Sequence, residues 1–403
     1  MYFYKNYSAN MKKRIFKILR IALKVILIIV ALVASYFITV IVINTRSNYT
    51  PPMNDTLKIN EGKKSFLFAD QNISIISWNI GYCGLGKEMD FFYEGGKHMR
   101  PGKDLYKSYI NAVFNIVSAM DSVDLVLLQE VDFNARRTYR NHQDSTFMKA
   151  LPSFSSVQAA NYDVPYVPFP LFNPMAHVYS GMMSFSRFVP EWAQRVSYPG
   201  SYSWPMSVFF LDRCFIIMRF DLENGKDLYV INTHNSAYSD AGDIRLIELY
   251  FLRSYILDLY SRGHYVIAGG DWNQNPPGFD STAIVSGDKV RMVGTSVTSD
   301  FLPSGWKWVY DPSLPTNRDV NTSYAKGQTT TTIIDYYLCS PNVIVNDIKT
   351  IDMGFTHSDH NPVYFNFSMM PDTLCCDSMK IYEGVKTKIA AEKKSGKKKQ
   401  TAQ

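Results

Sequence analysis

Between residues 73 and 368 the apolar residues fall into short runs, which polar residues, glycine and proline separate. The runs are rich in β-branched and aromatic side chains, a pattern typical of strands, many of them buried. They are Ile73–Trp78, Leu125–Leu128, Met182–Phe185, Val208–Leu211, Phe215–Phe220, Leu228–Ile231, Tyr265–Ala268, Ile333–Leu338 and Pro362–Phe367. This part of the chain is therefore expected to consist largely of β-sheet.

Two longer segments place apolar residues at helical spacing. Residues 104–120 carry Leu105, Tyr109 and Val113 on one face, and residues 240–260 repeat the pattern. An apolar stripe of this kind predicts a helix that packs one side against a core. Both segments are therefore expected to be helices that cover sheets.

The longest apolar run lies near the N-terminus. Val25–Ile43 comprises 19 residues without a charge, enough for a helix to cross a hydrocarbon layer of roughly 30 Å. Seven basic residues and no acidic ones precede it in residues 1–24, and Arg46 follows. This bias predicts a single-pass anchor in the cell (inner) membrane, with residues 1–24 in the cytoplasm and the rest outside. The alternative is a cleaved secretory signal, but no small-x-small cleavage site follows Ile43.

The remaining boundaries follow from composition. Residues 44–72 are predicted to be a polar linker, in which Pro51-Pro52 and Asn54-Asp55 block regular structure. Residues 73–368 form the predicted domain. Residues 369–403 are predicted to be a basic, disordered tail.

The formal charge of +6 is unevenly distributed. Residues 1–24 carry +7 and residues 380–403 carry +6, which leaves −7 on residues 25–379. An acidic body argues against a domain that grips nucleic acid with a broad basic face. The Lys-rich tail is either simply solvated or in contact with anionic lipid, and in a nuclease it could compensate for the acidic body.

The five cysteines show no disulfide framework and no zinc-site spacing. Cys375 and Cys376 are adjacent, so a bond between them would be strained. Cys214 and Cys339 lie in apolar runs and are predicted to be buried thiols.

Polar side chains stand at the ends of four predicted strands. They are Asn79, Glu130, Asp271, Asn273, Asp359 and His360. Each has a structural alternative when taken singly: a salt bridge for Glu130, a turn for Asn79, and an Asx-type turn for Asp271 and Asn273. Together they offer the oxygen ligands and proton-transfer groups of a Mg²⁺-dependent phosphoester hydrolase. Residues two apart on an extended segment point the same way, so Asp271 and Asn273 are expected to reach one phosphate.

Three further residues are candidates for the same chemistry. Asp335 lies inside an apolar run, and a hydrogen bond to the imidazole of His360 would satisfy its buried carboxylate and fix the ring. His234 follows the run Leu228–Ile231 and is a candidate donor to a phosphate oxygen, although a lone His is more often structural. Arg318 is a candidate phosphate clamp, with a surface salt bridge as the alternative.

Six segments together resemble the endonuclease/exonuclease/phosphatase superfamily, whose members include nucleases, inositol polyphosphate 5-phosphatases and bacterial sphingomyelinases. They are Ser77-Trp78-Asn79, Leu128-Gln129-Glu130, Asn232-Thr233-His234, Gly270-Asp271-Trp272-Asn273, Ile334-Asp335-Tyr336 and Ser358-Asp359-His360. The resemblance covers about residues 73–368. It implies an α+β four-layer sandwich of two packed mixed β-sheets flanked by helices, with the site at one edge. Residues 234–238 are also similar to those of bacterial, membrane-associated members.

The resemblance also implies roles for these residues. Glu130 would bind Mg²⁺ or Mn²⁺, with Asn79 and Asp359 completing or supporting the metal site. Asp271 would orient or deprotonate the attacking water, and Asn273 would steady the phosphate.

The resemblance also implies roles for the two histidines. His360, held by Asp335, would stabilise the pentavalent phosphorus or move a proton, and His234 would lie close to the scissile phosphate. Whether Asp271 or His360 is the general base stays open.

The expected function is therefore that of a membrane-anchored, outward-facing Mg²⁺-dependent phosphoesterase. It would hydrolyse phosphate mono- or diesters by in-line attack of an activated water, on a lipid-linked, soluble or nucleic-acid substrate. The alternatives are a nuclease that degrades extracytoplasmic DNA or RNA, and a non-catalytic binding module that retains the fold. Residues 272–332 are rich in Pro, Gly, Thr and Ser. So long an irregular stretch predicts loops around the mouth of the site, where specificity would lie.

Overall fold

Side chains along the central strands alternate between two separate cores. In the computed structural model, β2 (Asn72–Asn79) directs Ile73 and Ile75 into one hydrophobic cluster and Ile76 and Trp78 into another. This period of two is the pattern of a strand buried on both faces. The structure describes residues 2–371, apart from 238–241, 285, 294–297 and 299.

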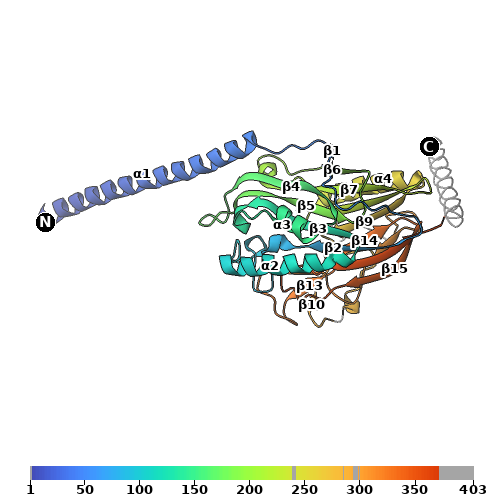
Figure 1. Cartoon of the computed structure of the whole chain (residues 1–403). Coiled ribbons are helices and arrows are strands. Elements are labelled where there is room, and N and C mark those ends of the chain that lie inside the picture. The colour runs from blue at the N-terminus through green and yellow to red at the C-terminus, as the bar shows by residue number, and fades with distance from the viewer. Residues whose placement is uncertain (1, 238–241, 285, 294–297, 299, 372–403) are drawn as a thin grey trace, which may run out of the picture.

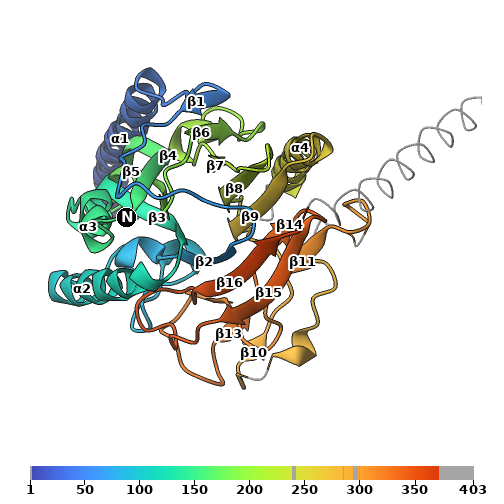
Figure 2. The same ribbon diagram turned by 45° about the vertical axis from the view of Figure 1, so that its right-hand side comes forward.

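The strand β2 belongs to a six-stranded sheet. The order is β15 (Val343–Thr350), β16 (Val363–Met369), β2, β3 (Leu125–Ala135), β5 (Ala176–Ser186) and β4 (Ser155–Val167). Neighbours are antiparallel except β2 and β3, which are parallel and joined through the helix α2 (Lys103–Ala119). With α3 (Gln143–Ala150), this helix covers the outer face of the sheet (Figure 2).

A seven-stranded sheet packs against the first. The order is β1 (Asn54–Thr56), β6 (Trp192–Ser197), β7 (Cys214–Asp221), β8 (Asp227–His234), β9 (Tyr265–Asp271), β14 (Asp335–Cys339) and β11 (Lys307–Val309). Again one pair, β8 and β9, is parallel and spans a helix, α4 (Gly242–Ser261), which covers the outer face.

Short elements complete the fold. A small sheet has the order β10 (Lys289–Val290), β13 (Thr330–Thr332) and β12 (Asn317–Arg318). The 3₁₀ helices are η1 (Gly81–Cys83), η2 (Phe92–Glu94), η3 (Met120–Ser122), η4 (Arg136–Thr138), η5 (Met206–Phe209) and η7 (Ser281–Ala283).

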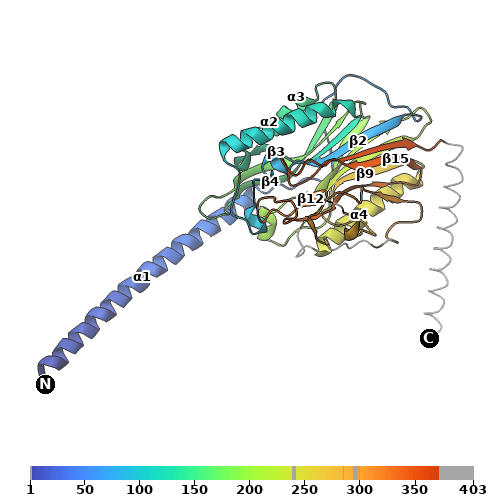
Figure 3. The same cartoon turned by 90° about the horizontal axis from the view of Figure 1, so that it is seen from below.

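The large sheets and the outer helices form four layers (Figure 3). The largest cluster of buried side chains, including Leu125, Leu127, Val230 and Ile267, lies between the two sheets. The predicted four-layer sandwich of mixed sheets and flanking helices is confirmed.

The helix α1 (Tyr2–Arg46) projects from the domain (Figure 1). Among the described residues, the stretch Lys13–Arg46 is the one helix long and apolar enough to cross a membrane. The last turns of α1 contact the domain. The Asn44 side-chain amide donates to the carbonyl of Tyr166, at 2.8 Å, at the end of β4.

Several local predictions need correction. Val208–Leu211 does not form a strand, because its first residues belong to η5. Asn54 and Asp55 do not block regular structure. They belong to β1, an edge strand of the seven-stranded sheet, which pairs with β6. Pairing with a ready edge outweighs the weak strand propensity of these side chains.

The loop region and the cysteines complete the comparison. Residues 272–332 contain four short strands rather than loops alone. Cys214 and Cys339 are buried free thiols, as predicted. Residues 372–403, which include Cys375 and Cys376, lie outside the described residues.

Candidate active site

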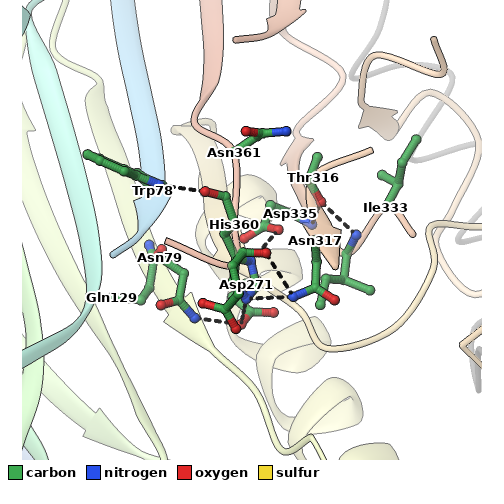
Figure 4. A network of polar contacts seen from close by, with 12 residues as sticks. Trp78, Asn79, Gln129, Asp271, Thr316, Asn317, Ile333, Asp335, His360 and Asn361 are labelled. Atoms are coloured by element: carbon green, nitrogen blue, oxygen red, sulfur yellow. Dashed lines mark hydrogen bonds and ion pairs between the residues drawn. The ribbon is translucent and has the colours of Figure 1, made fainter. Parts of the chain in front are cut away.

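Polar side chains from both large sheets meet at one edge of the sandwich (Figure 4). Asn79, at the end of β2, lies at the centre of this group. Its Nδ2 donates to Glu130 Oε1 at 3.2 Å and to Asp271 Oδ2 at 3.0 Å. Glu130 follows a buried strand segment and has a left-handed backbone, with φ of 56°. Three segments separated by up to 192 positions are thus in direct contact.

His360 lies beside this group and precedes β16. Its Nδ1 is 2.8 Å from Asp335 Oδ2, so the hydrogen bond expected from the sequence is present. Trp78 Nε1 donates to the His360 carbonyl at 2.9 Å and fixes the backbone. Burial opposes a charge on the ring, but the carboxylates of Asp335 and Asp271 outweigh it and raise the pKa of His360 well above its usual value. The imidazole is therefore protonated at neutral pH.

The pKa of Asp271 is raised as well, which for a carboxyl group favours the neutral form. Burial raises its pKa to about 7, and the Asp335 carboxylate adds to the shift, while His360 opposes it. Both of its oxygens have a donor: Asn79 for Oδ2 and the backbone N–H of Asn273 for Oδ1, at 2.9 Å. Asp271 is thus a fixed carboxylate that exchanges a proton near neutrality, which is what a general base requires.

His234 lies on the other side of Asp271. Its Nε2 is 3.5 Å from Asp271 Oδ2 and 3.8 Å from Glu130 Oε1. Burial, followed by the positive charges of Arg213 and His360, lowers the pKa of His234 well below its usual value. The ring is therefore neutral and offers one N–H as a donor.

Asn273 is placed differently from the expectation. The expectation that Asp271 and Asn273 point the same way assumed an extended backbone, but Asn273 has a φ of 54°. The Asn273 N–H donates to Asp271 Oδ1, which forms an Asx-type turn. Its Nδ2 donates to the carbonyl of Asn235 at 2.8 Å. Both Asp271 and Asn273 still line the same cavity, so a second N–H of the amide can face a ligand there.

Arg318 is neither a phosphate clamp nor a surface ion pair. It is buried, and its guanidinium donates to the carbonyls of Leu85, Gly86 and Met89 at 3.0, 2.9 and 3.2 Å. These bonds tie β12 to the loop after η1. The prediction is wrong because the strand turns Arg318 away from the cavity and its neighbour Asn317 towards it.

Sequence reasoning missed several side chains on the cavity wall. Asn317 Nδ2 is 3.0 Å from His360 Nε2. Arg213 and Arg137 add positive charge. Arg137 is held by Asp132 at 2.8 Å. These residues fall outside the six segments. For Asn317, the one signal in the sequence is that it directly precedes the candidate Arg318.

The cavity has a volume of about 460 Å³, within the range of small-ligand sites. Glu130, Asp271, Asp359 and His360 line its polar wall. The lining also includes further charged and polar residues, among them Arg137, Arg213 and Asn317, and apolar and aromatic residues, among them Phe91, Met175, Met206, Phe209 and Phe210.

Two groups of side chains could hold a metal ion. Within the described residues, the ligand atoms of Asp271, Asp335 and His360 lie within 4.8 Å of one another. However, the Asp335–His360 hydrogen bond already occupies this group, and a protonated ring cannot bind a cation. This arrangement is better suited to holding a proton.

Glu130 and Asp359 fit a divalent cation better, because they offer hard oxygen atoms. Asn79 would support such a site by positioning Glu130, since its own oxygen accepts from the Gly81 N–H and its Nδ2 donates to Glu130. Burial raises the pKa of Asp359 to about 6, and the neighbouring Glu130 contributes to this shift. The Ser358 hydroxyl donates to Asp359 Oδ1 at a long 3.3 Å. Glu130 and Asp359 line one cavity, and a divalent cation beside them would stabilise both carboxylates. The Asp335–His360 group is better suited to exchanging a proton.

The model of the Endonuclease/Exonuclease/phosphatase family matches residues 76–360, more than half of the chain. The chain belongs to this family. Members of the endonuclease/exonuclease/phosphatase family are typically metal-dependent phosphoesterases or nucleases. The matched segment begins in β2 and ends at His360, so it contains both sides of the polar cluster described above.

Solved structures of this family are similar to the chain. One is an endonuclease/exonuclease/phosphatase from Beutenbergia cavernae, with 15% identity, a TM-score of 0.49, and coverage of 74% of this chain and 72% of that one. Another is D. rerio TDP2 complexed with single-strand DNA product, with 16% identity, a TM-score of 0.47, and coverage of 74% and 100%. A third, from Bacteroides thetaiotaomicron, has 15% identity, a TM-score of 0.45, and coverage of 74% and 98%. Curated protein sequences give no significant match.

Proposed function

We propose that this protein is a Mg²⁺-dependent phosphoesterase that hydrolyses phosphate mono- or diesters. The observation that carries the proposal is the contact of Asn79 with both Glu130 and Asp271, beside the Asp335–His360 pair. A cation-binding carboxylate, a candidate base and a protonated imidazole thus share one cavity. This combination serves in-line attack of water on a phosphate.

Each side chain has a task in such an attack. Asp271 in its ionised form accepts a hydrogen bond from the attacking water and takes its proton. His360 places a positive ring where negative charge builds on the phosphate oxygens, and Asp335 holds that ring in position. Neutral His234 and the Asn273 amide donate to phosphate oxygens.

Glu130 and Asp359, with Asn79 positioning Glu130, would hold the Mg²⁺, which when bound neutralises charge on a phosphate or leaving oxygen. Arg213 also lines this cavity and adds positive charge to its wall. The wall therefore attracts a phosphate even though residues 25–379 carry a net negative charge.

We also propose that α1 anchors the enzyme in the cell (inner) membrane. The basic residues in 1–24 would keep that end in the cytoplasm, so that the catalytic domain faces outward. The long apolar stretch of α1 supports this placement.

The test uses the full-length protein in detergent with Mg²⁺. The panel consists of bis(p-nitrophenyl) phosphate, inositol phosphates, phospholipids and plasmid DNA. Asp271→Ala and His360→Ala should each lower turnover of the preferred substrate by at least two orders of magnitude, with the fold intact by circular dichroism. Asp258→Asn, in a surface ion pair on α4, is the matched control and should keep full activity.

Two results would contradict the proposal. Near-normal turnover by either cavity variant would remove the assigned role. No hydrolysis anywhere on the panel would favour a binding module. A strong preference for plasmid DNA would keep the phosphoesterase reaction and identify the protein as a nuclease.

A further inference from the structure

The membrane anchor leaves the domain at the same edge that carries the candidate active site. β3 and β4 are both antiparallel to β5, so their carboxyl ends lie at one edge of the sheet. Tyr162 of β4 and Met175, just before β5, line the cavity towards this edge, and Tyr166, near the carboxyl end of β4, accepts the hydrogen bond from α1. Figure 1 shows α1 running outward from this end of the domain.

The depth of α1 in a bilayer is constrained by its charges. Lys24 and Arg46 enclose 21 uncharged residues, which as a helix span roughly 31 Å, close to the hydrocarbon thickness. The span therefore has little freedom to slide. Phe37 lies nine residues before Arg46, roughly 13 Å along the helix. Its ring stacks on Phe169 of the domain, with centroids 6.0 Å apart. With Arg46 at the boundary between headgroups and acyl chains, Phe37 and the Phe169 loop beside it lie roughly 13 Å below that boundary, among the acyl chains of the outer leaflet.

Two loops at this position expose large apolar side chains. The first, between β4 and β5, exposes Phe169, Leu171 and Phe172, the last to 98%. The second, which leads into η5, exposes Trp204 and Met206. Here these five residues are called the apolar rim. An exposed apolar patch with aromatic residues is typical of a surface that enters a membrane interface.

The second loop is held directly against the anchor. Trp204 Nε1 donates to the Thr45 hydroxyl of α1 at 3.1 Å. Trp204 is 64% exposed, so its ring remains available to the surroundings. A Trp at the end of a membrane helix is in the usual position for contact with headgroups. The apolar rim is therefore continuous with the proposed membrane span.

The cavity reaches the apolar rim. Met206 belongs to the rim and also lines the cavity, followed by Phe209 and Phe210. Glu130 and Asp271 line the same cavity. A ligand with a polar head and an apolar body would match these two kinds of lining residue, with its phosphate near the carboxylates and its apolar part towards η5.

We propose that the apolar rim lies in the outer leaflet of the membrane that holds α1, with Trp204 at the level of the headgroups and the Phe169 loop among the acyl chains, and that the cavity receives its phosphoester from a lipid of that membrane. The lipid keeps its acyl chains in the bilayer beside Phe172 while its headgroup phosphate enters the cavity past Met206. This inference rests on the proposed phosphoesterase function and specifies the substrate class.

The first experiment compares one headgroup in two physical states. Full-length protein in a phosphatidylcholine nanodisc is given phosphatidylglycerol or phosphatidic acid, either long-chained in the same nanodisc or short-chained and monomeric in water. The double variant Leu171→Asp/Phe172→Asp should hydrolyse the long-chain lipid at least tenfold more slowly and the short-chain analogue at the wild-type rate. Phe66→Asp is the matched control, because Phe66 is 78% exposed near the opposite edge, where Ser65 contacts Val189 after β5. It should leave both rates unchanged.

The second experiment does not depend on turnover. Phe172→Cys and Phe66→Cys, each in a Cys375→Ser/Cys376→Ser background, carry an environment-sensitive fluorophore in the nanodisc. The label at 172 should shift to the blue and be quenched by spin-labelled lipid, while the label at 66 stays in water.

The outcomes separate the two proposals. An aqueous label at 172, or equal loss of long- and short-chain hydrolysis in the double variant, would overturn the membrane-seated rim. Hydrolysis of the short-chain analogue but not of the long-chain lipid, or of plasmid DNA instead, would overturn the lipid substrate while leaving a phosphoesterase. Failure on every phosphate ester would reject the phosphoesterase function itself, while the fluorophore still reports on the rim.

Discussion

Among single side chains, the Asp335–His360 pair is the clearest case of one residue setting the protonation of another. Asp335 Oδ2 lies 2.8 Å from the ring, and its charge helps to raise the pKa of His360. The carboxylate is nearly fully buried, so its charge acts in a medium that screens poorly. The protonated ring therefore depends on a partner from the other sheet.

Asp335→Asn should remove this support and lower the pKa of His360. Activity that requires the protonated ring would then decline at a lower pH than in the wild type. The change should reduce kcat by about 10- to 100-fold, with KM little affected. A pH–rate profile, together with NMR titration of the His360 ring, measures both effects. An unchanged alkaline limb would contradict the assigned role.

The acidic limb belongs to Asp271, whose pKa is raised to about 7. Below that pH the carboxyl is protonated and cannot accept a proton from water, so kcat/KM of the free enzyme should fall as the pH drops through about 7. Mg²⁺ nearby stabilises the ionised form and should move this limb to lower pH. The profile measured at low and saturating Mg²⁺ checks the direction; a shift to higher pH would be the contrary result.

Arg318 should affect stability rather than chemistry. Arg318→Ala removes a donor from three buried carbonyl groups, of which only that of Gly86 keeps another among the described residues, the Met89 N–H, and should cost about 2–4 kcal/mol of unfolding free energy. Arg318→Lys should recover part of this loss. Urea unfolding measures the cost, and kcat/KM of the remaining folded protein should be close to normal. A large loss of kcat/KM without loss of stability would instead support a phosphate clamp.

At the scale of elements, the parallel pair β8–β9 requires Gly270. Its φ is 146°, and a Cβ at this position would lie 2.0 Å from the carbonyl oxygen of Thr233. Both His234 and Asp271 end the strands of this pair. The glycine therefore allows the two strands to approach closely where they place the candidate catalytic residues His234 and Asp271.

Gly270→Ala should destabilise the fold by at least about 3 kcal/mol, because backbone strain and a collision add. Gly263→Ala is the matched control: its φ is also positive, at 93°, but nothing lies within 4 Å of the added Cβ. It should cost about 1 kcal/mol. Thermal unfolding of both variants makes the comparison, and equal losses would show that the collision is relieved.

Whether the sequence predicts a strand depends on how far its side chains are buried and on how continuous its apolar run is. Strands buried on both faces, such as β2 and β7, carry continuous apolar runs and are predicted. The strand β15 is missed because most of its side chains reach solvent, and β4 because polar residues interrupt it. The site residues at ends of buried strands were identifiable for the same reason. Asn317 was not, because β12 comprises two residues and has no pattern of its own.

For the whole molecule, a divalent cation should act as a stabilising ligand. A ligand that binds the folded state alone adds about 2.7 kcal/mol at a hundredfold excess over its Kd. Mg²⁺ should therefore raise Tm by several degrees, and EDTA should reverse the change. Because the pKa of Asp359 is raised to about 6, the effect should weaken as the pH falls through that value.

Glu130→Gln should remove most of this Mg²⁺-dependent rise, since it takes away a charged oxygen ligand. Asp258→Asn, far from the cavity on α4, is the control and should keep it. Scanning calorimetry with and without Mg²⁺ measures both. A full Mg²⁺ response in the Gln variant would place the ion elsewhere.

The distribution of the site over both sheets has a mechanical consequence. Asn79 and His360 come from one half of the sandwich and Asp271 and Asp335 from the other, and a buried bond of 2.7 Å from Gln129 to Asn232 pins the halves together. The proposed catalysis thus requires that the two sheets keep their relative position, although each sheet is held together by its own inter-strand hydrogen bonds. A shift of one sheet by a fraction of an ångström would abolish activity while the hydrogen bonds within each sheet persist. Loss of activity on heating should therefore precede loss of secondary structure.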